Sequence, residues 1–368
     1  MSAPKINQHY VPGLILKNFA FPERLSVYDS TRDRARHNQL PKNVLNERYF
    51  YGKDPGIENF LSKHVETPAT PFLDKLAERN IENNSAPSTE VLRFILVQWS
   101  RTPSFLNETL DVIDKFTGTL IRQIGELNDF PSEAVENIRA VPDDPKAIMN
   151  RLMLRSILMT DLIQDLGQAL LINETSTPYV IADHPVVHYN WYYKDCDEPG
   201  RTAFTARGLQ IFLPLSPSVT LCLYDKNVYK LNNGRSAIVK VQNVEDVHLL
   251  NGLQAFSRAD MIIFHAQESE SYVRSLCAEF AAGTLHYSSA GFTAVRSVAN
   301  DRLASEHSVW RSQARIDRWL SFVSIRTKAR KGRGSVVQRD PGVARASQQR
   351  MAYLREIEKA CAAGSSDL

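Results

Sequence analysis

The chain has 368 residues, with 44 Lys and Arg against 41 Asp and Glu, so its formal net charge is +3. This length predicts two domains, or one large domain with appendages, and a sizeable core that needs no staples. The hydrophobic share of 43% and the charged share of 23% are typical of a globular protein. With 16 glycines and 18 prolines, the composition excludes a collagen and a wholly disordered chain.

Neither a membrane span nor a disulfide framework is expected. The most apolar stretch, residues 148–172, is interrupted by charged residues, whereas a bilayer span needs roughly 20 mostly apolar residues. The first residues contain no apolar signal core. No C-x-x-C pair occurs among Cys196, Cys222, Cys277 and Cys361. We therefore expect free thiols in a reducing cytoplasm and no membrane partner.

The first half of the chain reads mainly as helix. Residues 25–28 alternate like a short strand, but the following apolar residues recur at helical spacing. This spacing predicts helices over residues 56–81, 89–100, 105–126 and 146–172. Pro68 and Pro71 should kink the first helix, and Ser88 marks the start of the second, which is apolar nearly all round and therefore buried.

The second half changes to short runs rich in β-branched and aromatic residues, which are typical of strands. These runs are residues 179–181, 186–189, 209–213, 219–224, 237–241 and 261–264, with a helix predicted over 244–258. Helices followed by strands favour an α+β fold with a mainly antiparallel sheet over alternating β and α units.

The predicted organisation is one α+β domain followed by an extension. We expect a domain over residues 1–290 (helix-rich 55–172, strand-rich 178–290), a helical extension over 291–325, a flexible basic segment over 326–350, and a short helix and tail over 351–368. Residues 326–350 carry a net charge of +7, which leaves −4 for the remainder. The small overall charge therefore conceals a mildly acidic body and a basic segment that can attract nucleic acid or an acidic partner.

His9, Glu58 and Glu66 are the first candidates for chemistry. A histidine can serve as a metal ligand or a general base near pH 7, although a histidine that only bonds nearby backbone is commoner. Glu58, Ser62 and Glu66 are spaced by four residues, so they share one stripe of a helix. Two such carboxylates can bind a divalent metal such as Mg²⁺ or Mn²⁺, or share acid and base work. A solvated charged face is the alternative.

Arg101 and Asp183 are the next candidates. Arg101 follows a buried helix, so its planar guanidinium can clamp a carboxylate or phosphate, or can simply complement the helix dipole. Asp183 precedes His184-Pro185 at a predicted strand end, where functional groups are common. The alternative is an Asx-turn. His184 and His188, if they lie on one strand, are about 13 Å apart, which is too far for one metal ion.

Common catalytic motifs are missing from the sequence. It contains no G-x-x-x-x-G-K-[ST], G-x-G-x-x-G, H-E-x-x-H or G-x-S-x-G segment. P-loop, Rossmann, zincin and serine-elbow chemistry is therefore not indicated.

Several motifs, taken in order, resemble one family. They are Q-H-Y-V-P with L-x-x-F (8–19), I-E-x-x-L-S with a Glu after it (57–66), R-T-P (101–103), A-D-H-P-V (182–186), P-L-S-P (214–217) and a fragment over 251–259. Together they resemble the mostly bacterial domain of unknown function 4238 over roughly residues 5–285. The extension after residue 290 departs from it. Ala182 replaces the usual Ser, and one extra residue precedes the second Glu of the 57–66 motif.

The resemblance implies that residues from distant segments converge on one pocket. We expect His9, Glu58 and Asp183 to be catalytic, and Arg101, Glu66 and Asn251 to bind substrate. One hypothesis is a hydrolase that acts on nucleic acid or a nucleotide, with Arg101 as an anion clamp. The alternative is a non-catalytic binding module, in which these residues form a structural network and the basic segment contacts nucleic acid or an acidic partner. A role in antiviral defence suits such a family, but no residue indicates it.

Overall fold

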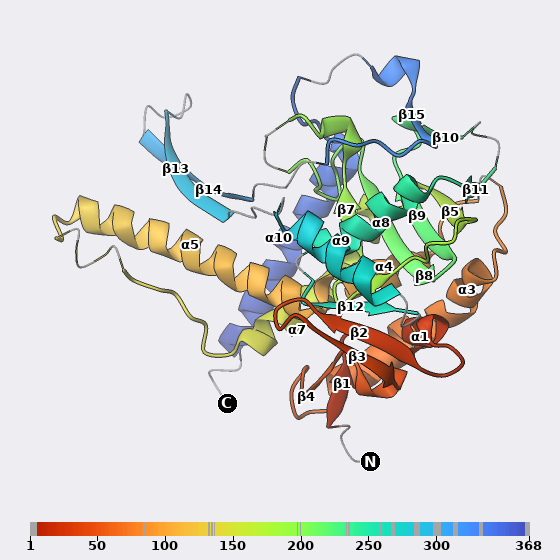
Figure 1. The fold of residues 1–368 in the computed structure, drawn as a ribbon. Helices are drawn as coiled ribbons and strands as arrows, with labels where there is room; N and C mark the ends of the chain where they lie inside the picture. Colours follow the sequence, from red (N-terminus) through yellow and green to blue (C-terminus); the bar gives the residue numbers. More distant parts are fainter. Residues whose placement is uncertain are drawn as a thin grey trace.

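The structure, a computed structural model, describes most of residues 6–364. Residues 84, 132, 134, 136, 197, 199, 233, 235, 258, 266–268, 283–287, 297–302, 312–315 and 331–333 within this range are not described. The fold is α+β, as predicted: N-terminal helices precede sheets that are mostly antiparallel (Figure 1).

The main sheet has five strands in the order β11-β5-β9-β8-β7. Their bounds are Ile238–Val241, Gly167–Asn173, Val219–Tyr224, Gln210–Ser216 and Val187–Tyr189. All neighbouring pairs are antiparallel except β11 and β5, which run parallel. Most residues of β5, β8 and β9 are buried, so these strands lie inside the molecule.

A second sheet joins the N-terminus to the later half of the chain. Its order is β3-β2-β12-β6, with bounds Arg34–Gln39, Leu25–Asp29, Met261–Phe264 and Ile181–Ala182. Because β2 pairs with β12, more than 200 residues later, the N-terminal segment is held against the strand-rich half. This pairing brings the first motif close to the Asp183 segment.

Three two-stranded pairs complete the sheets. Strands β1 (Asn7–His9) and β4 (Asn46–Arg48) pair near the N-terminus, β10 (Tyr229–Leu231) pairs with β15 (Val323–Ile325), and β13 (Ser288–Arg296) pairs with β14 (Leu303–Arg311).

Helices cover both faces of the main sheet. The N-terminal set is α1 (Gly13–Leu16), α2 (Gly56–Leu61), α3 (Thr67–Ala77), α4 (Thr89–Ser100), α5 (Pro103–Leu127) and α7 (Pro145–Ser156). The later set is α8 (Val244–Phe256), α9 (Glu270–Ala282) and α10 (Pro341–Gly364). Short 3-10 turns occupy Lys17–Phe19, Pro41–Asn43, Ile157–Leu162, Trp191–Tyr193 and Thr327–Ala329.

Alternating side chains of β5 show these two layers. Leu170 and Ile172 belong to a core shared with α4 and α7, whereas Ala169 and Leu171 belong to a second core shared with α8 and α9. The period of two along a strand sends neighbours to opposite faces, so β5 is covered on both sides. Helix α5 and the β13–β14 pair extend away from this body (Figure 1).

The long helix predicted over 146–172 is shorter in the structure. Helix α7 ends at Ser156, a 3-10 turn follows, and β5 begins at Gly167. A strand that is buried on both faces has a continuous apolar run, and such a run resembles a buried helix.

The helix predicted over 56–81 divides in the structure into α2, a π-helical turn and α3. Pro71 is inside α3, but the irregular part is a π-helical turn over Ser62–Glu66, ahead of both prolines. This turn ends at Glu66, which makes a contact described below.

The C-terminal extension differs most from the prediction. Strands β13, β14 and β15 occupy the region predicted as helical, and α10 begins at Pro341, well before the predicted terminal helix. The basic segment is packed against the body: Arg339, 4% exposed in its side chain, pairs with Asp165 at 2.6 Å. It also donates to the carbonyls of Leu162, Phe204 and Ala206. Because polar bonds hold this segment in place, its sequence has no apolar periodicity from which the packing could be predicted.

None of the helices within the described ranges is long and apolar enough to cross a membrane.

Candidate functional site

Arg101, at the end of α4, is a buried cation held by the protein's own side chains. Its side chain is 1% exposed. Nη1 donates to Glu66 Oε1 at 2.7 Å, and Nε donates to Gln98 Oε1 at 2.8 Å. Burial alone would lower the pKa of Arg101, but Tyr51 and Glu66 raise it overall, so the guanidinium stays charged. The predicted anion clamp therefore already holds a carboxylate, that of Glu66.

Side-chain amide groups connect the first motif to the surroundings of this cation. Gln98 Nε2 donates to the carbonyl of Tyr10, and Gln8 Oε1 accepts from the backbone N–H of Tyr51 at 2.7 Å. The Tyr51 hydroxyl donates to the His9 carbonyl at 2.9 Å. Buried polar groups need hydrogen-bond partners. Here these partners connect three parts of the chain, namely β1, α4 and the segment that follows β4.

Glu58 and Glu66 lie near the same tyrosine. Burial raises the pKa of Tyr51 and Arg101 opposes this, while the charges of Glu66 and Glu58 raise it further. The side chain of Glu66 is 27% exposed, so the Arg101 cluster reaches solvent there. The structure thus brings the His9, Glu58, Glu66 and Arg101 segments together around Tyr51.

Asp183 lies at the end of β6 and is bound by another strand. Oδ2 accepts from the backbone N–H groups of Asp260 and Met261, at 3.2 and 3.1 Å, whereas Oδ1 is buried without a hydrogen-bond partner. Burial and then the charge of Asp260 raise the pKa of Asp183 to about 8. The Asp183 carboxyl group therefore fastens β6 to the start of β12, a contact between distant segments in place of the local Asx-turn. The pKa of Tyr10 is raised first by burial and then by the charge of Asp183. Asp183 therefore lies near the first motif.

The residues after Arg101 and Asp183 touch each other directly. Thr102 Oγ1 is hydrogen-bonded to His184 Nδ1 at 2.6 Å. His188 stacks on Trp99, with ring centroids 5.4 Å apart. Burial and then the charge of His184 lower the pKa of His188 to about 3, so its ring is neutral. The R-T-P and D-H-P segments are therefore neighbours.

Asn251 serves a different contact. Its Oδ1 accepts from the backbone N–H of Val180, and its Nδ2 donates to the Pro178 carbonyl. One turn later on α8, Gln254 accepts from Ala182 N–H and donates to the Pro185 carbonyl. The two side-chain amides provide hydrogen-bond partners for backbone groups at and beside β6. Asn251 therefore stabilises the segment that carries Asp183.

Metal binding has no cluster to support it in this structure. Among the described residues, no group of three or more His, Cys, Asp or Glu side chains could hold a metal ion. The divalent cation stays a prediction.

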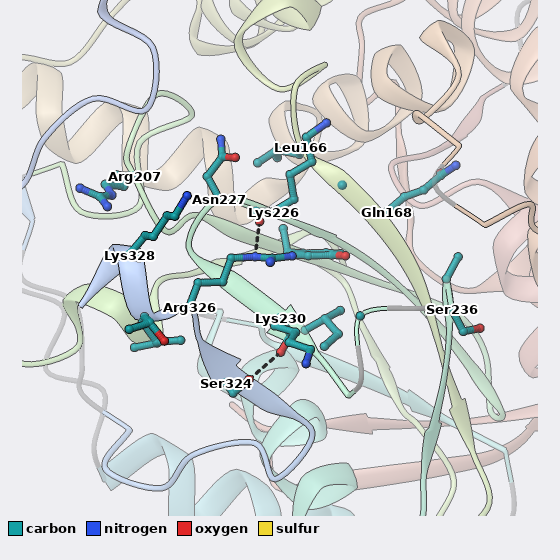
Figure 2. A pocket seen from close by; sticks show the side chains of 18 of the residues that line it. Leu166, Gln168, Arg207, Lys226, Asn227, Lys230, Ser236, Ser324, Arg326 and Lys328 are labelled. Atoms are coloured by element: carbon teal, nitrogen blue, oxygen red, sulfur yellow. Dashed lines mark hydrogen bonds between the residues drawn. The ribbon is translucent and has the colours of Figure 1, made fainter. Parts of the chain in front are cut away.

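A hollow of about 1110 Å³ lies on another part of the surface (Figure 2). It is bordered by β5, β9, β10 and β15, by the loop before α4, and by the 3-10 turn Thr327–Ala329. Among the described residues, its lining contains six that are cationic and no Asp or Glu: Arg207, Lys226, Lys230, Arg326, Lys328 and Arg330. Below, we call this feature the basic hollow. Sequence reasoning identified the last three cations within the basic segment and missed the first three.

The chain was compared with known proteins. A family model for a protein of unknown function, DUF4238, matches residues 7–268. The chain belongs to this family. The comparison with curated proteins and the comparison with solved structures each found no match. The DUF4238 match contains the Arg101 and Asp183 segments and one side of the basic hollow, whereas residues 326–330 lie outside it.

Three residues that bond to the Arg101 and Asp183 segments were missed by sequence reasoning. Gln98 and Tyr51 lie outside the recognised motifs, and Gln254 lies in the last fragment without a signal of its own. Spacing could place Gln98 on a buried helix one turn before Arg101, and a buried amide is a signal for such a network. Nothing in the sequence distinguishes Tyr51 from the other tyrosines.

Replacing Arg101 tests whether the network is structural. We expect Arg101→Met to lower the free energy of unfolding by about 3 kcal/mol, because Glu66 and Gln98 lose their shared partner. Urea unfolding measures the loss. The control is Arg93→Met on the exposed face of α4, for which a change below about 0.5 kcal/mol is expected. Equal losses in the two variants would contradict a structural role.

Asp183 predicts a pH dependence of stability. Its pKa is about 8 in the folded chain against an ordinary value of 3.8. The folded state therefore binds an extra proton between these values, and this stabilisation is complete below about pH 4 and is lost as the pH rises through about 8. Asp183→Asn removes the proton exchange. We expect the stability of the variant relative to wild type to increase from pH 5 to pH 8, measured by thermal unfolding. Parallel curves would refute the raised pKa.

Proposed function

We propose that this DUF4238 protein is a non-catalytic module that binds nucleic acid through the basic hollow and the adjoining segment. The observation that carries the proposal is the grouping of six cations, without a carboxylate, around one concave surface. Phosphate contacts supply most of the sequence-independent affinity of proteins for nucleic acid. The overall charge of +3 is small, so this concentration of charge is local.

The motif residues support this proposal by their engagement within the protein. Arg101 is bound to Glu66 and Gln98, Asn251 is bound to the backbone before β6, and one Asp183 oxygen is bound to the backbone of β12. Groups held in this way stabilise the contact between the helix-rich and strand-rich parts.

We place the protein in the cytoplasm in this proposal. Cys196, Cys222 and Cys277 are free thiols, and Cys222 is completely buried. Unpaired cysteines are usual in a reducing compartment.

Removing cations from the segment tests nucleic-acid binding. We expect Lys328→Ala/Arg330→Ala to weaken binding of a single-stranded oligonucleotide and to reduce the slope of log K against log salt by about 1.4, because two phosphate contacts are lost. Electrophoretic mobility shift at several salt concentrations measures this. Substitution is preferable to deletion of 326–350, since Arg339 anchors that segment to the body.

The matched control removes two exposed lysines far from the hollow in sequence, in Lys42→Ala/Lys53→Ala. Its slope should stay that of wild type. A protein that shifts no oligonucleotide at low salt, or two double variants with the same loss, would refute the proposal.

Hydrolysis of nucleic acid or a nucleotide is the second candidate function. Asp183 favours it, because a buried carboxyl with a pKa of about 8 and one unbonded oxygen has the properties of a general acid. If the function is hydrolysis, wild type cleaves RNA, DNA or a nucleoside triphosphate with Mg²⁺ or Mn²⁺, and Asp183→Asn and His9→Ala each lose at least about 100-fold in rate. An inactive wild-type protein would exclude this candidate for the substrates tested.

A further inference from the structure

The basic hollow is assembled from segments that are far apart in the sequence. Arg207, Lys226 and Lys230 come from the DUF4238 part of the chain, and Arg326, Lys328 and Arg330 come from beyond it. Figure 2 shows the Arg326 side chain lying between Lys226 and Lys230. Charges of one sign thus converge from at least two directions on a common space.

The backbone that carries these cations is fixed by hydrogen bonds. Strand β15 pairs with β10, and the N–H of Arg326 donates to the Val228 carbonyl at 2.9 Å. Arg326 Nε donates to the Lys226 and Tyr229 carbonyls, at 2.8 and 3.1 Å (Figure 2 draws the bond to Lys226). The Tyr192 hydroxyl donates a hydrogen bond to the carbonyl of the buried Ala329 at 2.6 Å. These hydrogen bonds therefore fix the backbone on this side of the hollow.

The turn that carries Lys226 is fixed from within. Asp225 is buried, and its carboxylate accepts from the backbone N–H groups of Gly208 and Asn227, both at 2.9 Å. Asp225 is not one of the residues that line the hollow, and its carboxylate fixes the turn from which the exposed Lys226 projects.

No acidic side chain in the described part of the chain forms an ion pair with the cations of the basic hollow. Within the described ranges, none of the six makes an ion pair with Asp or Glu, although Arg207 also lies over the ring of Tyr192 at 5.4 Å. Cations that face one space repel each other, and an anion between them removes this cost. Several phosphate groups on one ligand would be contacted from both sides.

The size of the hollow limits the ligand. A volume of about 1110 Å³ is slightly above the range of small-molecule sites, which typically span about 300–1,000 Å³. A chain of phosphates, free or at the end of a strand, can enter it.

We propose that the basic hollow is a binding site for a chain of two or more phosphate groups, carried by a nucleoside polyphosphate or by the 5′ end of a nucleic-acid strand. This site specifies the ligand of the proposed function. Where the phosphates belong to a nucleic-acid strand, the inference rests on that proposed function. Arg326, Lys226 and Lys230 contact the phosphates at the centre, and Lys328 and Arg330 extend the contact along the adjoining segment.

The test uses the full chain with inorganic tripolyphosphate as the probe. Binding raises the melting temperature by mass action, and calorimetry gives the affinity. We expect Lys226→Ala/Lys230→Ala to weaken tripolyphosphate binding at least 10-fold and Lys42→Ala/Lys53→Ala to leave it unchanged. All four lysines are exposed, and unchanged circular dichroism and melting temperature without ligand confirm that the variants fold.

Two further arms distinguish the sources of the phosphates. ATP tests the nucleotide, and matched oligonucleotides with a 5′-triphosphate or a 5′-hydroxyl test the strand end. A 5′-triphosphate preference that is lost in Lys226→Ala/Lys230→Ala assigns the strand end, and tight ATP binding with no such preference assigns the nucleotide.

Failure of the site and failure of the proposed function give different results. If oligonucleotides bind but tripolyphosphate does not compete with them, the site is overturned and nucleic-acid binding stands. If tripolyphosphate binds wild type and Lys226→Ala/Lys230→Ala equally, the site is also overturned. If tripolyphosphate binds selectively but no oligonucleotide does, the site stands for nucleotides and nucleic-acid binding is refuted.

Discussion

The ion pair between Arg101 and Glu66 is the contact on which the arrangement of the N-terminal half depends. A guanidinium at the end of an apolar helix cannot remain buried without an anionic partner. The partner comes from the last residue of a π-helical turn, and Gln98 links the same cation to the backbone of Tyr10. A single buried charge thus fixes how α4, the α2–α3 region and the first motif meet.

The Asp183 segment is fixed by a second group of polar contacts. Its carboxylate binds the start of β12, amide side chains of α8 cover the other edge of β6, and Thr102 contacts His184. Segments that are well separated in the sequence are therefore neighbours for structural reasons. Such polar networks specify one packing arrangement, which apolar contacts alone do less sharply.

Much of the fold was predictable because its signals are local. The buried helix over 89–100, its Ser88 cap and several strands of the second half follow from short-range spacing. The β5 region was assigned to helix because a strand covered on both faces has no alternation. The C-terminal strands and Arg339 were missed because they are held by partners distant in the sequence.

The candidate sites show the same division. The motifs drew attention to Arg101 and Asp183, but sequence could not reveal that Glu66 and Gln98 are the hydrogen-bond partners of Arg101. Composition located the charge of residues 326–350. It could not show that Lys226 and Lys230 face that segment, since this depends on the pairing of β10 with β15.

The late position of β15 has a consequence for synthesis of the protein. Lys230 and its hydrogen-bonded partner Ser324 are 94 residues apart, so half of the cations arrive long after the other half. A ribosome must translate beyond residue 330 before the two sides can meet. Nascent chains that are still being elongated through the DUF4238 region therefore carry only the first three cations of the basic hollow, and the other three join them after residue 330 has been added.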